Sequence, residues 1–436
     1  MDWREHCGDK LVSPQQAVKA AVRDGDSVQL NWLHATPLTL SQALLERKEE
    51  LRQVKVGTIG PLFNWDQPGV EQAFTIEATY LGTTTRPLMN DGRLDFIPVM
   101  YFRRGELPPG LKCDVYMTPV SAPDKHGYCS FGHGLFMSKT MAQAARTVVA
   151  EVHQDFIRTG GENYIHVSEI DYFVEPTQPP AQLPPTQRND EEVAATELIC
   201  TLVASNLVHD GDTLQIGLGS VSSPIAMYLG DKNDLGIHTE VIPGGIARLV
   251  KEGVITGKYK TVNPGKVVAS AGIGVFEDEL AIIDGNPNFE FYDFTYTDDL
   301  RLLVNQKNYV AVNNALAVDL GGQACSESFG PFMYTGTGGQ TTFTITAAFS
   351  NPGKSVIVTP ASSIVNGRRI SRIVPMLEPG SVVTAQRAFV DYVVTEYGIA
   401  ELRGKTLKQR AAALVEICHP DFKPDLLKEA KRIYFV

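Results

Sequence analysis

The chain has 436 residues, of which 43% are hydrophobic and 20% charged, and its formal net charge is −11. This composition is typical of a globular protein of two or three domains, and the acidic balance argues against a surface that binds nucleic acid or anionic lipid. The charged N-terminus has no apolar core of a signal peptide, and no apolar run is long enough to span a bilayer. We therefore expect a cytoplasmic protein with no nucleic-acid partner and no membrane partner.

The first elements that the sequence predicts are a helix and a strand joined by a turn, within residues 13–30. Ser13 is a suitable helix N-cap, and Asp24-Gly25-Asp26 is a turn sequence. A second helix is expected over 38–51 and an apolar strand over 54–59. This first half therefore begins as an α/β unit.

The same order of elements returns in the second half of the chain. A helix and a DGD turn lead into a strand within residues 189–220, and then come a predicted helix at 224–235 and a predicted strand at 237–242. The repetition predicts a duplicated α/β fold, in which two structurally related open halves have mostly parallel sheets.

A proline-rich stretch separates the two halves. Five prolines stand between positions 176 and 185, a density that sustains neither a helix nor a central strand. We place the domain boundary there and predict an N-terminal α/β domain over 1–185 and a C-terminal α/β domain over 186–436. Further short strands are expected at 115–121, 147–152, 266–270, 309–312, 355–359 and 391–395.

The cysteine pattern indicates no metal centre. The six cysteines lie far apart, without a C-x-x-C pair or a cysteine and histidine cluster at zinc spacing. We expect them to be buried thiols, with Cys325 next to polar residues the only one whose surroundings differ. The cysteines are Cys7, Cys113, Cys129, Cys200, Cys325 and Cys418.

The stretch 214–245 has the strongest chemical pattern. An apolar run ends in Gly217-Leu218-Gly219-Ser220, a loop that aims backbone N–H groups at an anion or an oxyanion. Glu240 follows at the end of the next predicted strand, at the sheet edge where ligands of α/β folds bind. Its spacing also fits the acid that holds a ribose in a dinucleotide site, although Ser222 stands where the third glycine of that fingerprint belongs.

Two further patterns bear on Glu240. His238-Thr239-Glu240 matches the H-x-E of zinc deaminases, but the P-C-x-x-C partner is absent from the sequence. A second glycine cluster at 334–343 is a candidate oxyanion cradle, beside which a desolvated glutamate can attack an activated acyl carbon. A surface turn and a solvated glutamate are the alternatives.

Several ordered motifs together resemble the acetyl-CoA hydrolase/transferase family, and more narrowly its butyrate or 4-hydroxybutyrate CoA-transferase type. The resemblance covers nearly the whole chain. The motifs are APDKHGYCSFG at 122–132, HTE at 238–240, NNA with VDL and SES within 313–328, GTGGQ at 336–340, SRIVP at 371–375, TEYG with AELRGK at 395–405 and HPDF at 419–422.

The resemblance implies an active site in the cleft between two related α/β domains. It makes Glu240 the nucleophile of a ping-pong reaction through a glutamyl-CoA thioester, with CoA or acyl-CoA as a substrate, no permanently bound cofactor and no metal. It also implies that small carboxylic acids are the other substrates. A homo-oligomer is expected from the prevalence of symmetric oligomers among soluble proteins. The CoA contacts that it implies are Gly217, Leu218, Gly219, Ser220, Val221, Leu316, Gly338, Gly339 and Gln340.

Alternatives stay open at this point. An acyl-CoA hydrolase on the same scaffold is the nearest, and an NAD-dependent dehydrogenase or a non-catalytic CoA sensor is more distant. The acid exchanged is open among short-chain monocarboxylates and dicarboxylates such as itaconate. For a dicarboxylate Arg103 or Arg104 would supply a cation, although a solvated arginine pair is the preferred interpretation of these two residues. The family pattern changes at Pro243-Gly244-Gly245 and at Thr342, and both changes concern the choice of acyl group.

Overall fold

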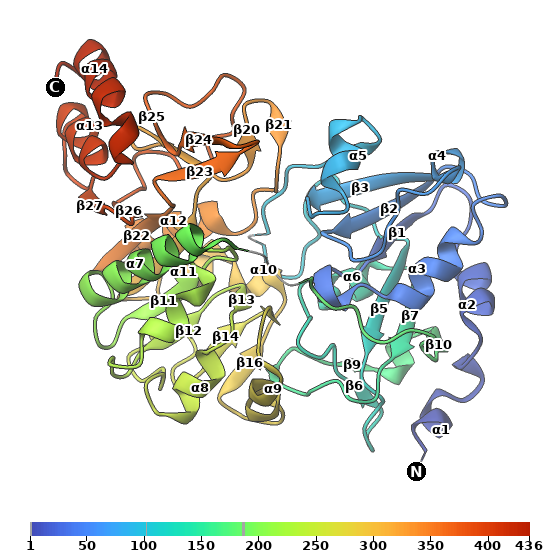
Figure 1. Ribbon diagram of the computed structural model, residues 1–436. Coiled ribbons are helices and arrows are strands. Elements are labelled where there is room, and N and C mark those ends of the chain that lie inside the picture. The colour runs from blue at the N-terminus through green and yellow to red at the C-terminus, as the bar shows by residue number, and fades with distance from the viewer. Residues whose placement is uncertain (1, 102, 185–187) are drawn as a thin grey trace. The chain divides into compact units, whose positions relative to one another are not determined.

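The computed structural model describes residues 2–101, 103–184 and 188–436 (Figure 1). The chain divides into two compact units, one of Met1–Pro184 with Val268–Asp299 and the other of Pro185–Val267 with Leu300–Val436. Segment 268–299, which the sequence assigns to the second domain, thus packs with the first unit. The boundary predicted at residue 185 lies outside the described residues and stays a prediction.

The first unit is built on a seven-stranded sheet in the order β10-β7-β5-β1-β2-β3-β4, in which every pair of neighbours is parallel. The predicted strands at 54–59, 115–121 and 147–152 are confirmed as β2, β5 and β7. The strands are β1 (Ser27–Leu30), β2 (Val54–Ile59), β3 (Phe74–Tyr80), β4 (Leu94–Phe96), β5 (Val115–Val120), β7 (Thr147–Val152) and β10 (Tyr172–Val174).

Shorter elements complete this unit. The helices are α1 (Trp3–Cys7), α2 (Pro14–Ala21), α3 (Leu38–Leu45), α4 (Val70–Ala73), α5 (Arg86–Asn90), α6 (Ser138–Ala144), α9 (Glu277–Ile283) and α10 (Phe294–Thr297). The short strands are β6 (Tyr128–Cys129), β8 (Gly160–Gly161), β9 (Ile165–His166), β15 (Ala271–Gly272) and β16 (Phe289–Phe291), and β14 (Val267–Ala269) begins at the unit boundary.

The second unit repeats the order of the first sheet. Its strands follow one another as β27-β26-β22-β17-β11-β12, so that β26-β22-β17-β11-β12 corresponds to β10-β7-β5-β1-β2. Neighbours are parallel except for the β26–β27 hairpin. The strands are β11 (Thr213–Ile216), β12 (Gly236–His238), β17 (Tyr309–Asn314), β22 (Gly353–Val358), β26 (Tyr392–Thr395) and β27 (Gly398–Glu401). The shared order confirms the predicted fold of two related, mostly parallel α/β halves.

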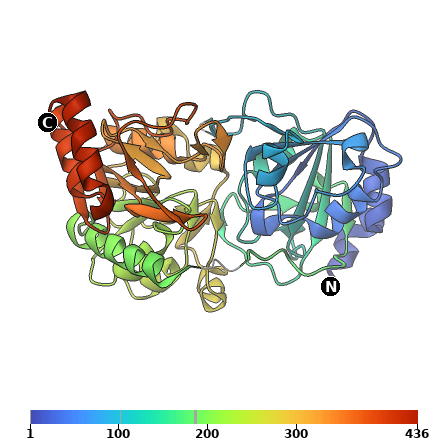
Figure 2. The same cartoon turned by 45° about the horizontal axis from the view of Figure 1, so that its top comes forward.

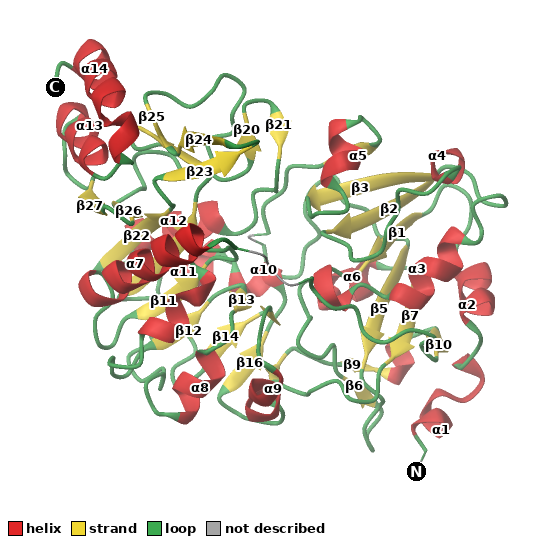
Figure 3. Cartoon of the chain, viewed as in Figure 1, coloured by secondary structure: helices red, strands yellow, loops and turns green. Residues whose placement is uncertain are grey.

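Helices and short hairpins complete the second unit (Figure 3). The helices are α7 (Asp190–Asn206), α8 (Ile246–Lys251), α11 (Leu300–Leu303), α12 (Gln340–Phe349), α13 (Leu407–Glu416) and α14 (Lys423–Tyr434). The short strands are β13 (Val241–Ile242), β18 (Ala317–Asp319), β19 (Ala324–Cys325), β20 (Ser328–Phe329), β21 (Phe332–Met333), β23 (Ser362–Val365), β24 (Arg368–Ser371) and β25 (Ile373–Val374).

The two DGD turns have matching hydrogen bonds. Gly25 N–H donates to Arg52 O at 3.1 Å, and Gly211 N–H donates to Asn233 O at 2.9 Å. Both glycines have a positive φ, 77° and 78°, which a residue with a Cβ rarely adopts. The backbone carbonyl of the last aspartate in each turn accepts a hydrogen bond from the neighbouring strand. Lys55 N–H donates to Asp26 O, and Gly236 N–H donates to Asp212 O, both at 2.9 Å.

Two predicted elements of the second half are wrong in extent. The helix expected over 224–235 is a 3-10 helix, η4 (Ser223–Tyr228), and the turn around Gly230 ends it early. The strand expected over 237–242 is interrupted, because β12 ends at His238 and β13 begins at Val241. Glu240 therefore lies in the break between two strands.

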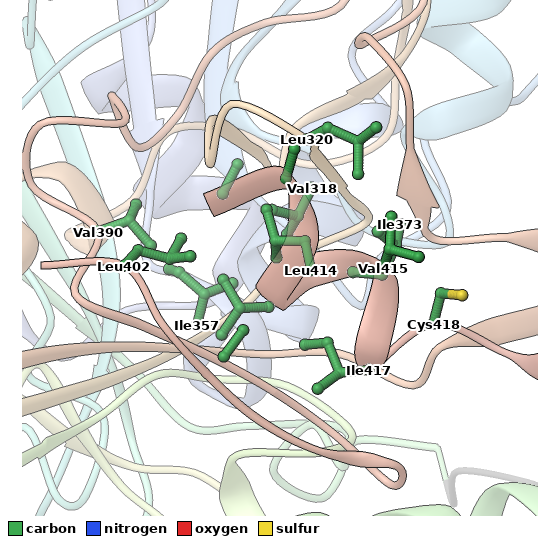
Figure 4. Close-up of a cluster of buried hydrophobic side chains, with 14 of the residues drawn as sticks. Val318, Leu320, Ile357, Ile373, Val390, Leu402, Leu414, Val415, Ile417 and Cys418 are labelled. Atoms are coloured by element: carbon green, nitrogen blue, oxygen red, sulfur yellow. The ribbon is translucent and has the colours of Figure 1, made fainter. Parts of the chain in front are cut away.

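Helices α13 and α14 cover the core of the C-terminal part, where they lie side by side (Figure 2). A capping box of Thr406 and Gln409 starts α13, and its Leu414 and Val415 are fully buried. Figure 4 shows these side chains among Val318, Ile357 and others of one apolar cluster. Burying such side chains contributes about 1.5–3 kcal/mol each, so α13 has a packing role.

The predicted burial of the cysteines is confirmed, since all six are buried and free. Burial raises the pKa of Cys129 and of Cys200 to about 12, which keeps both thiols protonated at neutral pH. Among the described residues, no group of His, Cys, Asp and Glu side chains has the arrangement of a metal site. No described helix has the length and apolar character needed to cross a bilayer.

The buried carboxylate of Asp26, in the first DGD turn, stabilises the fold through its hydrogen bonds. Its carboxylate accepts from Arg23 N–H at 2.9 Å and from the Arg146 guanidinium at 2.8 and 3.1 Å. Burial acts to raise the pKa of Asp26, but these hydrogen bonds outweigh it and hold the pKa below the ordinary 3.8. The carboxylate therefore stabilises the fold above the ordinary pKa, and this contribution is lost as the pH falls through the lowered value.

We expect Asp26→Asn to lower the free energy of unfolding at pH 7 by about 1–3 kcal/mol, the typical loss for a charged buried partner. At about pH 3 the difference from wild type should shrink, because this aspartate takes up a proton in the unfolded chain below its ordinary pKa, which reduces the advantage of the ionised native carboxylate. Thermal unfolding at both pH values measures this, with Asp155→Asn at an exposed aspartate as control. An equal loss at both pH values would contradict the ionic role of Asp26.

Candidate active site

The glycine loop at 217–221 begins directly after β11. Gly217 N–H donates to Val312 O on the neighbouring strand β17 at 2.8 Å. A Cβ on Gly217 would lie 2.6 Å from Asn313 Oδ1, and one on Gly219 would lie 2.0 Å from Asn314 Nδ2. Both glycines are therefore needed because the paired asparagines at the end of β17 lie against the loop.

Asn314 holds this loop in place. Its Oδ1 accepts from Val221 N–H at 3.3 Å and from Ser222 N–H at 3.2 Å, while its Nδ2 donates to Ser222 Oγ at 2.5 Å. The Ser222 hydroxyl in turn donates to Gly217 O. These bonds close the loop on itself, so that its conformation is fixed before any ligand binds.

Only part of the predicted cradle remains open. The N–H groups of Gly217, Gly219 and Val221 are already donated to Val312 O, Ser223 Oγ and Asn314 Oδ1. Within the described part of the chain, the N–H groups of Leu218 and Ser220 have no hydrogen-bond partner, and both residues are exposed. These two are the donors that this loop can offer to a ligand.

Glu240 lies at the same edge of the sheet as the glycine loop. Thr239 Oγ1 contacts the backbone of Ile216, accepting from its N–H at 3.3 Å, and lies 3.2 Å from Val241 O. Since Ile216 precedes Gly217 and Thr239 precedes Glu240, the Thr239 hydroxyl ties the glutamate to the loop. Thr239 is 1% exposed, whereas Glu240 itself is partly exposed.

Two side chains from outside β12 also hold the backbone before Glu240. Tyr309 OH donates to His238 O at 2.8 Å, and His238 is fully buried. Lys260 Nζ, from a buried lysine, donates to Ile237 O at 2.6 Å. These side-chain bonds add to the pairing of β12 with β11, and they help to hold a carboxylate at the carboxyl end of a parallel sheet.

The second glycine cluster forms the start of helix α12. Gly339 is the N-cap residue, and its carbonyl accepts from Phe343 N–H at 3.0 Å. For the residues that the structure describes, the N–H groups of Gly338, Gly339 and Gln340 have no partner, and the buried Nε2 of Gln340 also has none. This cluster therefore offers more unused donors than the first loop does.

Leu316 differs from the other predicted CoA contacts. Its N–H donates to Cys325 O at 2.7 Å, and its carbonyl accepts from Arg372 Nη1 at 3.0 Å. Burial lowers the pKa of Arg372, although the group stays charged at neutral pH. The main chain of Leu316 can therefore act toward a ligand only through the remaining lone pair of its carbonyl.

Hydrogen bonds link the two glycine segments. Ser326 Oγ donates to Asn314 O at 2.7 Å, and Thr335 Oγ1 donates to Ser326 O at 3.0 Å. Sequence reasoning passed over Asn314, Ser326 and Thr239 as site residues. The sequence signals for Asn314 and Ser326 are the asparagine doublet at 313–314 and the polar SES at 326–328, and the signal for Thr239 is the HTE motif at 238–240.

The turn at 243–245 packs on the 3-10 helix that follows the glycine loop. A Cβ on Gly245 would lie 3.1 Å from the Ala226 side chain and 3.2 Å from Met227 Sδ. Gly245 is also the N-cap residue of α8. The turn that departs from the family pattern therefore packs directly on η4. A larger residue at position 245 would displace η4.

The arginines considered for a dicarboxylate are ion-paired. Arg103 Nη1 lies 3.5 Å from Glu106 Oε2, and Arg104 pairs with Glu162. The Arg104 guanidinium also lies 4.8 Å from the centre of the Tyr296 ring. Both side chains are more than half exposed, at 60% and 52%, which is typical of solvated arginines rather than of a substrate clamp.

Comparison with known families identifies the class of protein. The acetyl-CoA hydrolase/transferase N-terminal domain matches residues 1–184, and the C-terminal domain of the same family matches residues 277–430. The chain belongs to the acetyl-CoA hydrolase/transferase family. It is therefore an enzyme of the kind that this family contains, as the resemblance of its motifs predicts.

Individual relatives extend over the full chain. A 4-hydroxybutyrate coenzyme A transferase of Clostridium kluyveri is 38% identical over 99% of this chain and 100% of its own length. A butyryl-CoA:acetate CoA-transferase of Anaerostipes caccae is 32% identical over 99% of this chain and 98% of its own. The crystal structure of RipA from Yersinia pestis has a TM-score of 0.88 at 29% identity and covers 100% of both chains.

Proposed function

We propose that this protein is a short-chain acyl-CoA:carboxylate CoA-transferase of the 4-hydroxybutyrate or butyrate type. The full-length relatives with these names support the reaction class. The observation that carries the proposal is the placement of Glu240 in the break between β12 and β13, tied through Thr239 to the residue before the glycine loop. Family membership favours CoA-thioester chemistry over a dehydrogenase.

In the proposed mechanism Glu240 is the nucleophile. A carboxylate oxygen attacks the thioester carbonyl of the donor, the C–S bond breaks, and CoA leaves as a thiolate, which gives an acyl-glutamyl anhydride. The thiolate then attacks the glutamyl carbonyl, releases the donor acid as a carboxylate and leaves a glutamyl-CoA thioester. The acceptor carboxylate repeats these steps in reverse and leaves as the new acyl-CoA.

We assign the oxyanion donors chiefly to the N–H groups of Gly338, Gly339 and Gln340, because these have no hydrogen-bond partner among the described residues. Most N–H groups of the loop at 217–221 already donate to acceptors of the protein itself. Leu218 and Ser220 supply further donors to CoA. Fixed donors stabilise the tetrahedral intermediates without reorganisation, and the loss of one such donor typically costs about 3–4 kcal/mol of barrier. No ATP is required, since one thioester replaces another.

We expect monocarboxylates to be preferred as acceptors. A dicarboxylate such as succinate or itaconate needs a cation for its far carboxylate, and Arg103 and Arg104 are already paired with glutamates. The cytoplasmic location and the homo-oligomeric state stay predictions, the second of them resting on the prevalence of symmetric oligomers among soluble proteins.

An acceptor screen tests the proposed function. The protein is incubated with acetyl-CoA and, one at a time, butyrate, 4-hydroxybutyrate, propionate, succinate or itaconate, and the new thioesters are identified by mass spectrometry. The expected result is butyryl-CoA or 4-hydroxybutyryl-CoA, with acetate released. Free CoA formed at the same rate without any acceptor would make the protein a hydrolase. Binding of CoA without turnover would make it a sensor.

A further inference from the structure

A pocket of about 260 Å³ opens beside the start of helix α12, within the second unit. One wall comes from the loop before α12 and from the first turns of the helix, and the other comes from segment 382–389. The lining residues are Glu327, Thr337, Thr341, Thr344, Ile345, Val382, Val383, Thr384, Ala385, Gln386 and Phe389. Two of them, Thr337 and Thr341, flank the glycine residues assigned to CoA.

Glu327 places a buried carboxyl group in this wall. It is 3% exposed, and its Oε2 accepts from Thr337 Oγ1 at 3.0 Å. Burial raises the pKa of Glu327, an effect that hydrogen bonds from Thr384 and Thr337 partly offset. The mechanism proposed above makes no use of the Glu327 carboxyl group. Its oxygens can accept hydrogen bonds from a ligand in the pocket.

Thr344 adds a hydroxyl that the protein itself does not use. The residue is 1% exposed, and throughout the described residues its Oγ1 finds no hydrogen-bond partner. Its neighbour Thr341 differs, because Thr341 Oγ1 donates to Thr384 O at 2.8 Å. A buried hydroxyl left unpaired is unfavourable, and a ligand in the pocket that bonds to it would remove this penalty.

The charge of the lining restricts what can bind. The lining residues include one carboxyl group and no lysine, arginine or histidine. A phosphate or a carboxylate would thus enter a site without a cation and meet Glu327, which is unfavourable in a partly desolvated pocket. Ile345, Val382 and Phe389 provide apolar surface. The lining suits a neutral group with N–H donors on an apolar body.

We propose that this pocket binds a neutral, N–H-bearing part of the CoA substrate, with Glu327 and Thr344 as its hydrogen-bonding groups. The inference rests on the proposed function for the identity of the ligand. In CoA the chemistry named is present twice, in the amino group of the adenine ring and in the amides of the pantetheine arm. The acyl group and the phosphates lie elsewhere.

Val383→Trp at the mouth of the pocket tests the proposal. Val383 is 43% exposed, so a larger side chain there narrows the entrance without disturbing the core. The expected result is a KM for acetyl-CoA raised by about tenfold or more, since an ordered ligand group is displaced, with kcat within about twofold of wild type. Ile364→Trp, at a 48% exposed residue of β23, is the matched control and should leave both constants unchanged.

Truncated donors identify the part of CoA that binds. If the pocket holds adenine, the ratio of variant to wild-type KM returns to one with acetyl-pantetheine. If it holds the pantetheine amides, the ratio stays raised with acetyl-pantetheine and returns to one with S-acetyl-mercaptoethanol, a thioester that has no amide. An unchanged KM for acetyl-CoA, or a ratio that stays raised with both truncated donors, overturns the proposal.

A measurement of CoA binding tests the pocket proposal independently of the transferase proposal. Calorimetric titration of CoA should show a Kd for Val383→Trp that is weaker by about the same factor as the KM, whether or not any acid accepts the acyl group. If wild-type protein binds CoA but transfers it to no acid, the transferase proposal fails and the pocket proposal is still decided by the ratio of the two Kd values. Equal Kd values would refute the pocket alone.

Discussion

Replacing Glu240 by alanine is expected to reduce the rate of CoA transfer by on the order of 10⁴-fold or more, because the covalent intermediate cannot form without the carboxylate. Glu240→Asp should keep the intermediate but lose on the order of 10²-fold, since a carboxylate one methylene shorter misses the attack geometry. Steady-state transfer from acetyl-CoA to butyrate measures both variants. Glu252→Ala, at an exposed glutamate at the end of α8, is the control.

Borohydride trapping distinguishes a nucleophile from a structural glutamate. Borohydride reduces a thioester to an alcohol, so wild-type protein should lose activity only when an acyl-CoA has been added first. Peptide mass spectrometry should then place the reduced residue at 240. Full activity of Glu240→Ala, or trapping at another residue, would show that the proposed mechanism is wrong.

Gly219→Ala is expected to weaken CoA binding strongly. A Cβ at this position would lie 2.0 Å from Asn314 Nδ2, and the asparagine cannot move away without giving up its bonds to Val221, Ser222 and the Ser222 hydroxyl. Losing these contacts loosens the loop, and we expect a rise of about tenfold to a hundredfold in the KM for acetyl-CoA together with a lower kcat.

Gly230→Ala is the matched control for this change. Gly230 follows the same 3-10 helix, and an added Cβ would meet nothing within 4 Å. This variant should keep both kinetic constants, and its thermal stability should equal that of wild type. A Gly219→Ala protein with unchanged KM would show that the loop at 217–221 does not contact CoA.

The parts of the fold that are determined by residues close together in the sequence could be predicted from it. The DGD turns require a glycine with positive φ between two aspartates. A helix capped by Ser13 precedes the first of these turns, and an apolar strand follows it. Each of these signals lies within a few residues of the element that it fixes. The repeated order of the two sheets followed because the same local signals occur twice.

The break at Glu240 could not be predicted in this way. The run around 237–242 has the apolar pattern of one strand, and the Thr239 hydroxyl interrupts it by bonding to Ile216, 23 residues away. The occupied donors of the glycine loop have a similar cause, since Asn314 lies 93 residues from Val221 in the chain. A glycine loop in the sequence indicates where donors lie, and only the fold decides which of them remain unused.

The discontinuous first unit has a consequence for how the protein is made. Phe294 packs on Trp32 and Phe136 with ring centres 5.5 and 5.9 Å apart, and Asp293 accepts a hydrogen bond from Thr140 N–H at 3.0 Å. The first 184 residues therefore emerge from the ribosome without the segment that completes their aromatic core. This unit can finish folding only after residue 299 has been synthesised, so the newly made N-terminal half exposes apolar surface during that interval.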